Sequence, residues 1–339
     1  KPLIQALSGQ KTERIPFWYM RQAGRYLPEY NQIRSQMTFM ELTRNVSAAV
    51  EVSKQPFFRF GMDGLIMFSD ILTPLSGAGI PLHFEEKRGP VLEKVIRKSE
   101  DLGALHDFEA SRDTPYVGEI LQKLREFCDA EGPALIGFAG APFTLASYLI
   151  EGGSTRSFDQ CKRILFSDPV LYESLANRLT EISANYLSMQ IDAGAEVIQL
   201  FDSWGGVLSL EHYQVFAAPY NRSIIARLKE KHPHTPIILF VGNASHLTSE
   251  LIAAGADALS LDWRVPDLEI QRIPASLSIQ GNLDPLVLYG SGTTVEHETR
   301  RTLQKFRNRA GYVFNLGHGI HPATPIENVE TMVRTIRGS

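Results

Sequence analysis

Apolar and polar positions along this chain follow two regular patterns. Short runs of mostly apolar residues are separated by longer segments in which apolar residues recur every three or four positions. The first pattern is typical of buried β-strands and the second of amphipathic α-helices. The expected strands are Pro16–Met20, Gly64–Phe68, Ala134–Phe138, Ala195–Phe201, Pro236–Val241, Ala256–Leu261, Ser276–Gln280 and Tyr312–Leu316. The clearest expected helices are Pro115–Ala130, Pro169–Asp192 and Thr294–Ala310.

Strands and helices alternate along the whole length, and this order predicts a parallel α/β sheet built from βα units. Eight strands match the strand number of a (β/α)₈ barrel, the TIM-type architecture. Three of the strands follow similar turns, at Gly61, Gly194 and Gly255, where a left-handed glycine would end the preceding helix. No run of Pro, Gly, Ser or like charges divides the chain, so residues 1–339 are expected to form a single barrel domain.

A long insertion lies between the second and third expected strands. Within it, Leu82–Phe84 and Val91–Leu92 flank the turn-like segment Lys87–Pro90, a pattern that favours a β-hairpin. We expect this hairpin to cap the mouth of the barrel or to contact another subunit. An open doubly wound sheet is the structural alternative, but no Gly-x-Gly-x-x-Gly motif follows the first strand.

The composition is that of an ordinary globular protein. Of the 339 residues, 43% are hydrophobic and 21% are charged, and the mean hydropathy is -0.12, so the chain can bury a large core. No apolar stretch is long enough to span a membrane, and residues 1–10 lack the apolar core of a signal peptide. We therefore expect a cytoplasmic protein without a membrane partner, whose two cysteines, Cys128 and Cys161, are buried and reduced.

The net charge of -4 disfavours nucleic acid as a partner, because nucleic-acid binding needs a surplus of Lys and Arg along one face. The amino-terminal arm, residues 1–44, differs from the rest because it carries seven basic and three acidic side chains. This surplus predicts an anion-binding arm in an acidic protein. Its arginines suit carboxylates, since the planar guanidinium can bind both oxygens and keeps its charge.

The carboxyl ends of the expected strands supply the candidate functional side chains, because reacting groups in a (β/α)₈ barrel come from these ends and the loops after them. Two fixed cations, one carboxylate and three hydroxyl or imidazole groups are found there, a set that suits a polar, anionic substrate. They are Arg21, Arg25, Asp70, Tyr148, Ser203 and His318.

The charged candidates also have structural explanations. Arg21 and Arg25 could pair with a neighbouring carboxylate such as Glu29. Asp70 follows a strand and could cap the next helix. Position alone therefore leaves both interpretations open for these three residues.

For the candidates other than Arg21, Arg25 and Asp70, a structural role is easier to assign to two residues than to the third. Tyr148 could be a core residue of its helix, and Ser203 a turn residue. His318 is less easily structural, because glycines on both sides let the backbone approach another group closely. The pair Asp284–Pro285, just past the seventh strand, is typical of a turn.

Five segments together form a specific pattern. The longest, Ile15–Tyr30, reads IPFWYMRQAGRYLPEY, and Gly137–Gly153 reads GFAGAPFTLASYLIEGG. Both resemble signatures of the uroporphyrinogen decarboxylase family, with phenylalanine at position 143 where tryptophan is common in the family. Three shorter segments are similar in the same order, so the resemblance runs nearly end to end. They are Phe68–Ile71, Gln280–Pro285 and Asn315–Gly319.

The resemblance implies an enzyme that needs no cofactor or metal and acts as a homodimer. Members of this family remove the four acetate carboxyl groups of uroporphyrinogen III, a small-molecule substrate, to give coproporphyrinogen III in haem biosynthesis. Matched to this sequence, the family pattern gives catalytic roles to Asp70 and Arg21. The substrate-binding residues that it implies are Arg21, Gln22, Ala23, Gly24, Arg25, Asp70, Tyr148, Ser203 and His318.

The implied substrate is a reduced macrocycle whose pyrrole N–H groups can converge on one acceptor, and ionised Asp70 is the expected acceptor. Loss of CO₂ needs an electron sink, which protonation of the adjacent pyrrole carbon supplies by making the ring a cation. A fixed carboxylate would stabilise that cation as it forms. The proton donor stays open between Arg21 and a water molecule that it holds, because a guanidinium is a poor acid.

Other functions fit the pattern less well. A zinc-dependent, corrinoid-linked methyltransferase shares the fold, but Val241–Ala244 and Gly317–Ile320 contain no cysteine ligand. A hydrolase using Ser203, His318 and Asp202 lacks the usual Gly-x-Ser-x-Gly turn. A phosphate-binding barrel enzyme would need more clustered amide groups after the last strands. A non-catalytic tetrapyrrole carrier could use the same arginines, but it has no need of a buried carboxylate.

Overall fold

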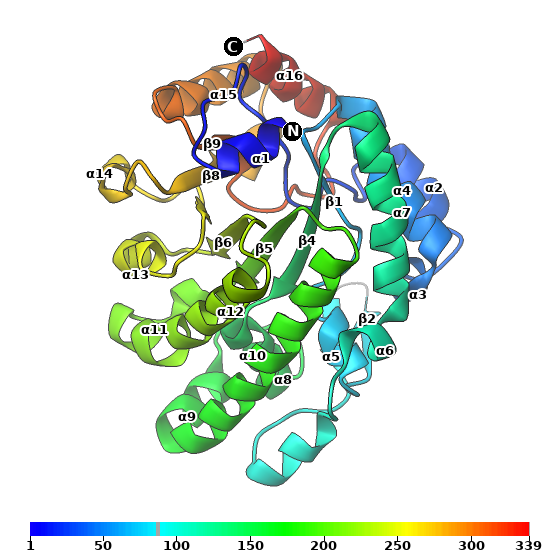
Figure 1. Ribbon diagram of the computed structural model, residues 1–339, viewed down its shortest axis with the longest axis vertical. Helices are drawn as coiled ribbons and strands as arrows, with labels where there is room; N and C mark the ends of the chain where they lie inside the picture. Colours follow the sequence, from blue (N-terminus) through cyan, green and yellow to red (C-terminus); the bar gives the residue numbers. More distant parts are fainter. Residues whose placement is uncertain (86–88, 339) are drawn as a thin grey trace.

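A curled parallel sheet forms the centre of the molecule, and the helices cover its outer face (Figure 1). The structure is a computed structural model that describes residues 1–85 and 89–338. Its seven strands lie side by side in the order β1-β4-β5-β6-β7-β8-β9, all parallel. They are β1 (Gly64–Ile66), β4 (Ala134–Gly140), β5 (Val197–Asp202), β6 (Ile237–Val241), β7 (Ala258–Ser260), β8 (Ser278–Leu283) and β9 (Tyr312–Leu316).

Helices precede and follow the strands, as the periodic pattern predicts. The three helices expected from the sequence are present: α7 ends one residue later than predicted, α10 agrees at both ends, and α15 lies two to four residues earlier. The helices are α1 (Pro2–Leu7), α2 (Pro28–Arg34), α3 (Phe39–Arg44), α4 (Val46–Phe60), α5 (Thr73–Gly77), α6 (Ala110–Asp113), α7 (Pro115–Glu131), α8 (Pro142–Glu151), α9 (Asp159–Ser167), α10 (Pro169–Asp192), α11 (Leu210–Phe216), α12 (Ala218–Lys231), α13 (Thr248–Ile252), α14 (Asp267–Arg272), α15 (Gly292–Phe306) and α16 (Ile326–Arg337).

Short 3₁₀ helices connect some of these elements. They are η1 (Ser99–Ala104), η2 (Gly205–Val207), η3 (Ser245–Leu247) and η4 (Pro285–Tyr289). The Asp284 carboxylate accepts a hydrogen bond from Leu286 N–H at the start of η4, which confirms Asp284–Pro285 as a turn. The glycine turns are also confirmed, since Gly61, Gly194 and Gly255 all have positive φ. Both cysteines are free and buried, as predicted.

The predicted first strand, Pro16–Met20, is wrong as a regular strand, because it pairs with β9 only through a bridge between Phe17 and Phe314. It nevertheless fills the eighth place in the barrel. The N–H of Phe314 donates to Pro16 O (2.9 Å) on one side, and the N–H of Asp63 donates to Phe17 O (2.9 Å) on the other. The segment 16–20 therefore links the two edge strands of the sheet, and we call it the closing segment.

The amino-terminal arm does not lie wholly at the mouth of the barrel. Helix α1 covers the opposite end, where the strands begin: Ser278 Oγ donates to Ala6 O (2.9 Å) at the start of β8. Lys1 pairs there with Glu196 (2.6 Å), and Arg14 donates to both carboxylate oxygens of the buried Asp63. The expectation that the whole arm binds anions is thus corrected, since Lys1 and Arg14 are neutralised within the fold.

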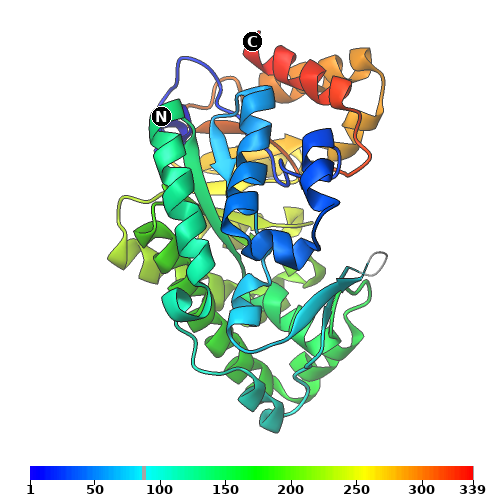
Figure 2. The same cartoon turned by 90° about the vertical axis from the view of Figure 1, so that its right-hand side faces the viewer.

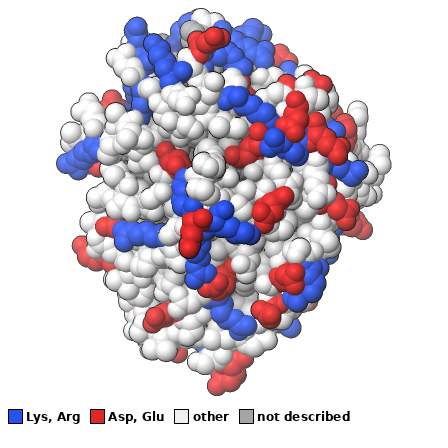
Figure 3. Space-filling view, in the orientation of Figure 1, with Lys and Arg blue, Asp and Glu red and all other residues white. Residues whose placement is uncertain are grey.

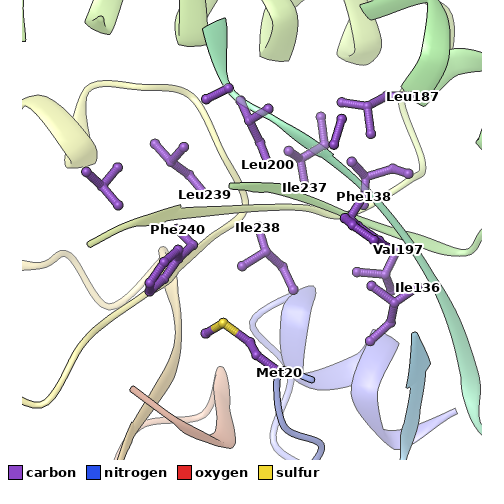
Figure 4. Close-up of a cluster of buried hydrophobic side chains, with 14 of the residues drawn as sticks. Met20, Ile136, Phe138, Leu187, Val197, Leu200, Ile237, Ile238, Leu239 and Phe240 are labelled. Carbon is purple, nitrogen blue, oxygen red and sulfur yellow. The ribbon is translucent and has the colours of Figure 1, made fainter. Parts of the chain in front are cut away.

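The barrel interior is apolar at most positions. Strands β4 and β6 are buried along their whole length, as expected of parallel strands covered on both faces. Figure 4 shows part of this core, with Ile136, Val197 and Ile238 among the labelled side chains. Met20, at the end of the closing segment, lies within the same cluster (Figure 4).

A polar group of four side chains crosses this interior, and we call it the interior network. Gln280 Nε2 donates to Gln199 Oε1 (2.9 Å) and to Ser260 Oγ (2.9 Å), while its Oε1 accepts from Trp18 Nε1 (2.8 Å). All four residues are buried. The network ties the closing segment to β5, β7 and β8, because each of these elements contributes one of its members.

The insertion after β1 contains the predicted hairpin, with β2 (Leu82–Glu85) paired antiparallel to β3 (Gly89–Leu92). Of the predicted turn, Lys87 and Arg88 lie outside the described residues. The hairpin is fixed beside α8, since Leu92 N–H donates to Gly152 O (3.0 Å). It projects beside the α2–α3 region in the side view (Figure 2), where Phe84 packs against Phe39 with ring centroids 4.5 Å apart.

Candidate active site

A cavity of about 290 Å³ opens at the carboxyl ends of the strands. Four of the six candidates selected by position line it, and they come from segments far apart in the sequence. Arg21 follows the closing segment, Tyr148 lies on α8, Ser203 follows β5 and His318 follows β9. The whole lining comprises Arg21, Ile71, Tyr148, Ser203, Trp204, Gly242, Asn243, Asp262, Trp263, Arg264 and His318.

Arg21 is held in an unusual conformation. Its φ of 62° lies in the left-handed region, which is unfavourable for a residue with a side chain and is often found at functional sites. A side chain at position 319 would collide with Arg21, so Gly319 makes room for it. Arg21 forms no ion pair within residues 1–85 and 89–338. Glu29, its expected structural partner, instead pairs with Arg59 at 2.8 Å.

The loop that follows contains three predicted binding residues. Gln22 is fully buried, and its amide can donate to Gly64 O (3.2 Å) and accept from Ile66 N–H (3.3 Å) along the free edge of β1. The Gln22 side chain therefore satisfies backbone groups of β1 in the wall of the barrel. In the described part of the chain, the backbone N–H groups of residues 22–24, which include Ala23 and Gly24, donate to no acceptor. They are the groups that this loop can offer to an anion.

Arg25 has an exposed side chain and is not part of the cavity lining. Its carbonyl accepts from Asn31 Nδ2 (2.9 Å), which fixes the loop, and its guanidinium has no carboxylate partner among the described residues. The structure thus brings Arg21 into the cavity and leaves Arg25 outside it.

Asp70 follows β1 and is not part of the cavity lining, although the next residue, Ile71, is. Its Oδ1 accepts from Leu72 N–H (2.8 Å) in a turn, but α5 begins only at Thr73, with Leu72 as its cap. The predicted structural role, a helix N-cap, is therefore wrong, although one oxygen holds a turn. Burial raises the pKa of Asp70, while the Leu72 N–H and the charge of Arg21 act in the opposite direction.

Tyr148 stacks on Trp204, with ring centroids 4.0 Å apart and planes 27° from parallel. Burial, together with the nearby charge of Asp70, raises the pKa of Tyr148 to about 12, so its hydroxyl stays protonated and can donate. Ser203 precedes Trp204 in the loop after β5 and contributes a hydroxyl to the same wall. An aromatic stack with two hydroxyl groups suits a flat, polar ligand.

His318 is neutral at physiological pH. Burial, with the charge of Arg21 and of two further neighbours, lowers the pKa of its imidazole to about 4. Its Nδ1 accepts from Gly319 N–H (2.8 Å), so the ring proton is on Nε2. The flanking glycines behave as predicted: a side chain at Gly317 would lie 2.7 Å from the backbone nitrogen of Trp263.

Several lining residues were not predicted. Trp263 and Arg264 follow β7, and Asn243 follows β6 with a φ of 57°. Asp262 fixes both loops, since its oxygens accept from Asn243 N–H (2.6 Å) and Arg264 N–H (2.7 Å). The rule that selected the other candidates, a polar side chain just after a strand, would also have found Arg264.

The geometry does not form a Ser-His-Asp triad. Asp202 is buried, and it accepts from Thr144 Oγ1 (2.8 Å) and Asn221 Nδ2 (3.1 Å), not from His318. Burial raises the pKa of Asp202 to about 6, against the effect of these hydrogen bonds. Thr144 Oγ1 also accepts from Trp204 N–H (3.2 Å), so this buried group holds the loop that carries Ser203.

The following two absences concern residues 1–85 and 89–338. No three His, Cys, Asp or Glu side chains there gather in a way that could hold a metal ion. No helix there has the length and apolar character needed to cross a membrane. Figure 3 shows Lys and Arg intermixed with Asp and Glu on the face seen in Figure 1.

The sequence matches one family model, described as uroporphyrinogen decarboxylase, over residues 1–339. A uroporphyrinogen decarboxylase from Parasynechococcus marenigrum is 42% identical over 335 residues, which cover 98% of this chain and 95% of that protein. One from Carboxydothermus hydrogenoformans is 40% identical over 334 residues, again covering 98% and 95%.

Among solved structures, a methyltransferase from Methanosarcina mazei is similar with a TM-score of 0.81. The alignment covers 99% of this chain and 97% of that one, with 19% sequence identity. At this identity the likeness concerns the fold alone, and it agrees with the α/β barrel described above.

Proposed function

The chain belongs to the uroporphyrinogen decarboxylase family, and from this premise we propose that it removes the acetate carboxyl groups of uroporphyrinogen III by chemistry centred on Asp70. The product would be coproporphyrinogen III, a step of haem biosynthesis. We infer that residues 1–339 act as one catalytic domain without a cofactor.

One observation carries the assignment of the site. Arg21 lines the cavity without an ion-pair partner in the described chain, and its charge acts on the Asp70 carboxyl group, whose neighbour Ile71 lines the same cavity. A cation and a carboxyl group that burial has partly desolvated cost folding free energy unless a ligand uses them. An octacarboxylate ring with central N–H groups is complementary to both. Its carboxylates suit Arg21 and the free amides of residues 22–24, while its N–H groups suit Asp70.

The chemistry that we propose uses the ring as its own electron sink. Protonation of the pyrrole carbon beside an acetate makes the ring a cation, and ionised Asp70 stabilises it. The bond to the carboxyl carbon then breaks, its electron pair neutralises the ring, and CO₂ leaves. A second proton adds to the remaining methylene and the first is released, so each cycle exchanges one CO₂ for one proton. Preorganised charge can contribute several kcal/mol to such a step.

The neutral groups of the cavity have positioning roles in this proposal. Tyr148 and Ser203 offer hydroxyl donors, and His318 offers its Nε2–H, all without changing charge near neutral pH. Each can hold a carboxylate or the ring edge. The proton donor is Arg21 or a water molecule that it holds, in keeping with the position of this side chain in the cavity.

The direct test is anaerobic incubation of the purified protein with uroporphyrinogen III, followed by chromatography of the oxidised products. We expect successive loss of four carboxyl groups. Binding of uroporphyrinogen III without loss of carboxyl groups would indicate a non-catalytic tetrapyrrole carrier. Failure to bind uroporphyrinogen III would contradict the assignment of the site. Metal analysis of the same preparation tests the zinc-dependent methyltransferase alternative.

We also propose that the protein is a homodimer with the two cavities near each other, as the family resemblance implies. Sedimentation is the test, since a dimer would have twice the 37.9 kDa mass of the chain. A species of 37.9 kDa alone at the assay concentration would contradict this assembly.

A further inference from the structure

Arg264 is a second cation of the cavity wall, and the chemistry above gives it no role. Its side chain is exposed, and its guanidinium lies over the ring of Trp263, 4.0 Å from the ring centre. In residues 1–85 and 89–338 it has no carboxylate partner. The nearest acid along the chain, Asp262, is buried and uses its two oxygens for backbone N–H groups.

The backbone of Arg264 is fixed, although its guanidinium has no carboxylate partner among the described residues. Asp262 Oδ1 accepts the N–H of Arg264 at 2.7 Å, and the same carboxylate holds the β6 loop through Asn243. Stacking on the Trp263 ring further limits the guanidinium, whose flat face suits an aromatic surface. A restrained and unpaired arginine loses less entropy when it binds a carboxylate than a mobile one does.

The order of the barrel places Arg264 across the cavity from Asp70. With the closing segment in the eighth place, β7 is four places from β1 in either direction around the ring. Asp70 follows β1 and Arg264 follows β7. The charge of Arg264 also contributes to the lowered pKa of His318, which is consistent with its facing the same space.

We propose that Arg264, stacked on Trp263, binds a propionate carboxylate of the macrocycle at the wall opposite Asp70. The inference rests on the proposed function. With the pyrrole N–H groups directed to Asp70, the peripheral carboxylates point toward the other walls, and the far wall presents a cation. A propionate is the assigned partner because it is retained in every intermediate and in the product, so the same contact can serve all four steps.

The test compares wild type with Arg264→Gln in the anaerobic assay. We expect KM for uroporphyrinogen III to rise about 10-fold, the low end for a charge-assisted contact because Arg264 is exposed, with kcat within about 2-fold. Coproporphyrinogen III, which carries propionates alone, should inhibit the variant about 10-fold more weakly. Arg264→Lys keeps the positive charge but cannot stack a flat guanidinium on Trp263. We expect its KM to lie between those of the wild type and Arg264→Gln.

Arg272→Gln is the matched control, because Arg272 is exposed on the nearby α14, pairs with Glu269 (2.7 Å) and lies outside the cavity. Arg272→Gln should leave KM and kcat unchanged. Neither Arg264→Gln nor Arg272→Gln should lower the melting temperature. Unchanged KM in Arg264→Gln would overturn the inference, and a raised KM with unchanged product inhibition would contradict the propionate assignment. Absence of turnover by the wild type would instead overturn the proposed function itself.

Discussion

The interior network and the cavity mouth use polar side chains in opposite ways. In the interior, Gln280 is hydrogen-bonded to Trp18, Gln199 and Ser260, and within this buried group Gln199 Nε2 is the one side-chain atom without a partner among the described residues. At the mouth, beyond the carboxyl ends of the strands, the guanidinium groups of Arg21 and Arg264 have no carboxylate partner in the described chain. Polar groups that satisfy each other stabilise the fold, whereas groups left unsatisfied are available to a ligand.

The same contrast appears among the cations of the amino-terminal arm. Lys1 and Arg14 are paired with Glu196 and Asp63, near the ends where the strands begin. Arg21 lies seven residues beyond Arg14, at the other end of the barrel, and forms no ion pair within the part of the chain that the structure describes. Charge alone therefore does not identify a binding residue, and the end of the barrel that it occupies decides its role.

The largest effect should come from removing the charge of Asp70. We expect Asp70→Asn to lower kcat on the order of 100-fold or more, with a much smaller change in KM, because the variant keeps the shape but not the charge. Asparagine can still accept from Leu72 N–H, so the turn should survive. Steady-state kinetics under anaerobic conditions provide the measurement.

The stability of this variant separates catalysis from folding. Burial raises the pKa of Asp70 above its value in the unfolded chain, so the folded state loses stability as the pH rises between these two pKa values, and the loss is complete at neutral pH. Asp70→Asn should therefore be at least as stable as wild type at neutral pH in urea unfolding. A folded variant with near-normal turnover would overturn the mechanism.

The interior network should show the reverse behaviour. We expect Gln280→Leu to lower the free energy of unfolding by about 2 kcal/mol, because the Trp18 indole N–H and the Gln199 amide would lose their buried partner. KM and kcat of the folded fraction should stay close to wild type. A large change in KM with unchanged unfolding would show that the network belongs to the site.

The two arginines of the RQAGR segment sharpen the distinction within the mouth. Arg21 lines the cavity, so Arg21→Gln should raise KM by roughly 10- to 100-fold. Arg25 lies outside the lining, and Arg25→Gln should cost about 10-fold or less. Steady-state kinetics of the two variants should be measured in parallel. An equal rise in KM for both variants would show that Arg25 also contacts the substrate. Unchanged KM and kcat in both would show that neither arginine belongs to the site.

The smallest effect is expected at His318. Its pKa of about 4 means that the imidazole is neutral above about pH 5, so it donates through Nε2 without titrating. His318→Gln can keep a donor near that place and should lose less than about 10-fold in kcat/KM.

The pH profile of the wild type provides a separate test. Its kcat should fall as the pH drops through the pKa of Asp70, since the ionised form is active, and should show no separate inflection near pH 6.5. An inflection near pH 6.5 in the wild type that is absent in His318→Gln would show that His318 titrates, and would contradict the conclusion that it is neutral.

The sequence was sufficient for the barrel because its apolar runs must be buried on both sides. Seven of the eight expected strands are present, and Tyr312–Leu316 agrees at both ends. The eighth, Pro16–Met20, has the same apolar pattern but closes the sheet through few hydrogen bonds. Composition cannot distinguish a full strand from such a segment, since both are buried equally.

The sequence by itself determined the order of strands along the chain, the family resemblance and four of the residues that line the cavity, because the carboxyl end of each strand follows directly from where its apolar run stops. Only the tertiary structure decided which charges are free. Glu29 is nearer in sequence to Arg25 than to Arg59, yet it pairs with Arg59, and Arg264 faces the cavity while Arg272 pairs with Glu269. Pairing depends on distances of a few ångströms between side chains from different elements, and local sequence does not specify these.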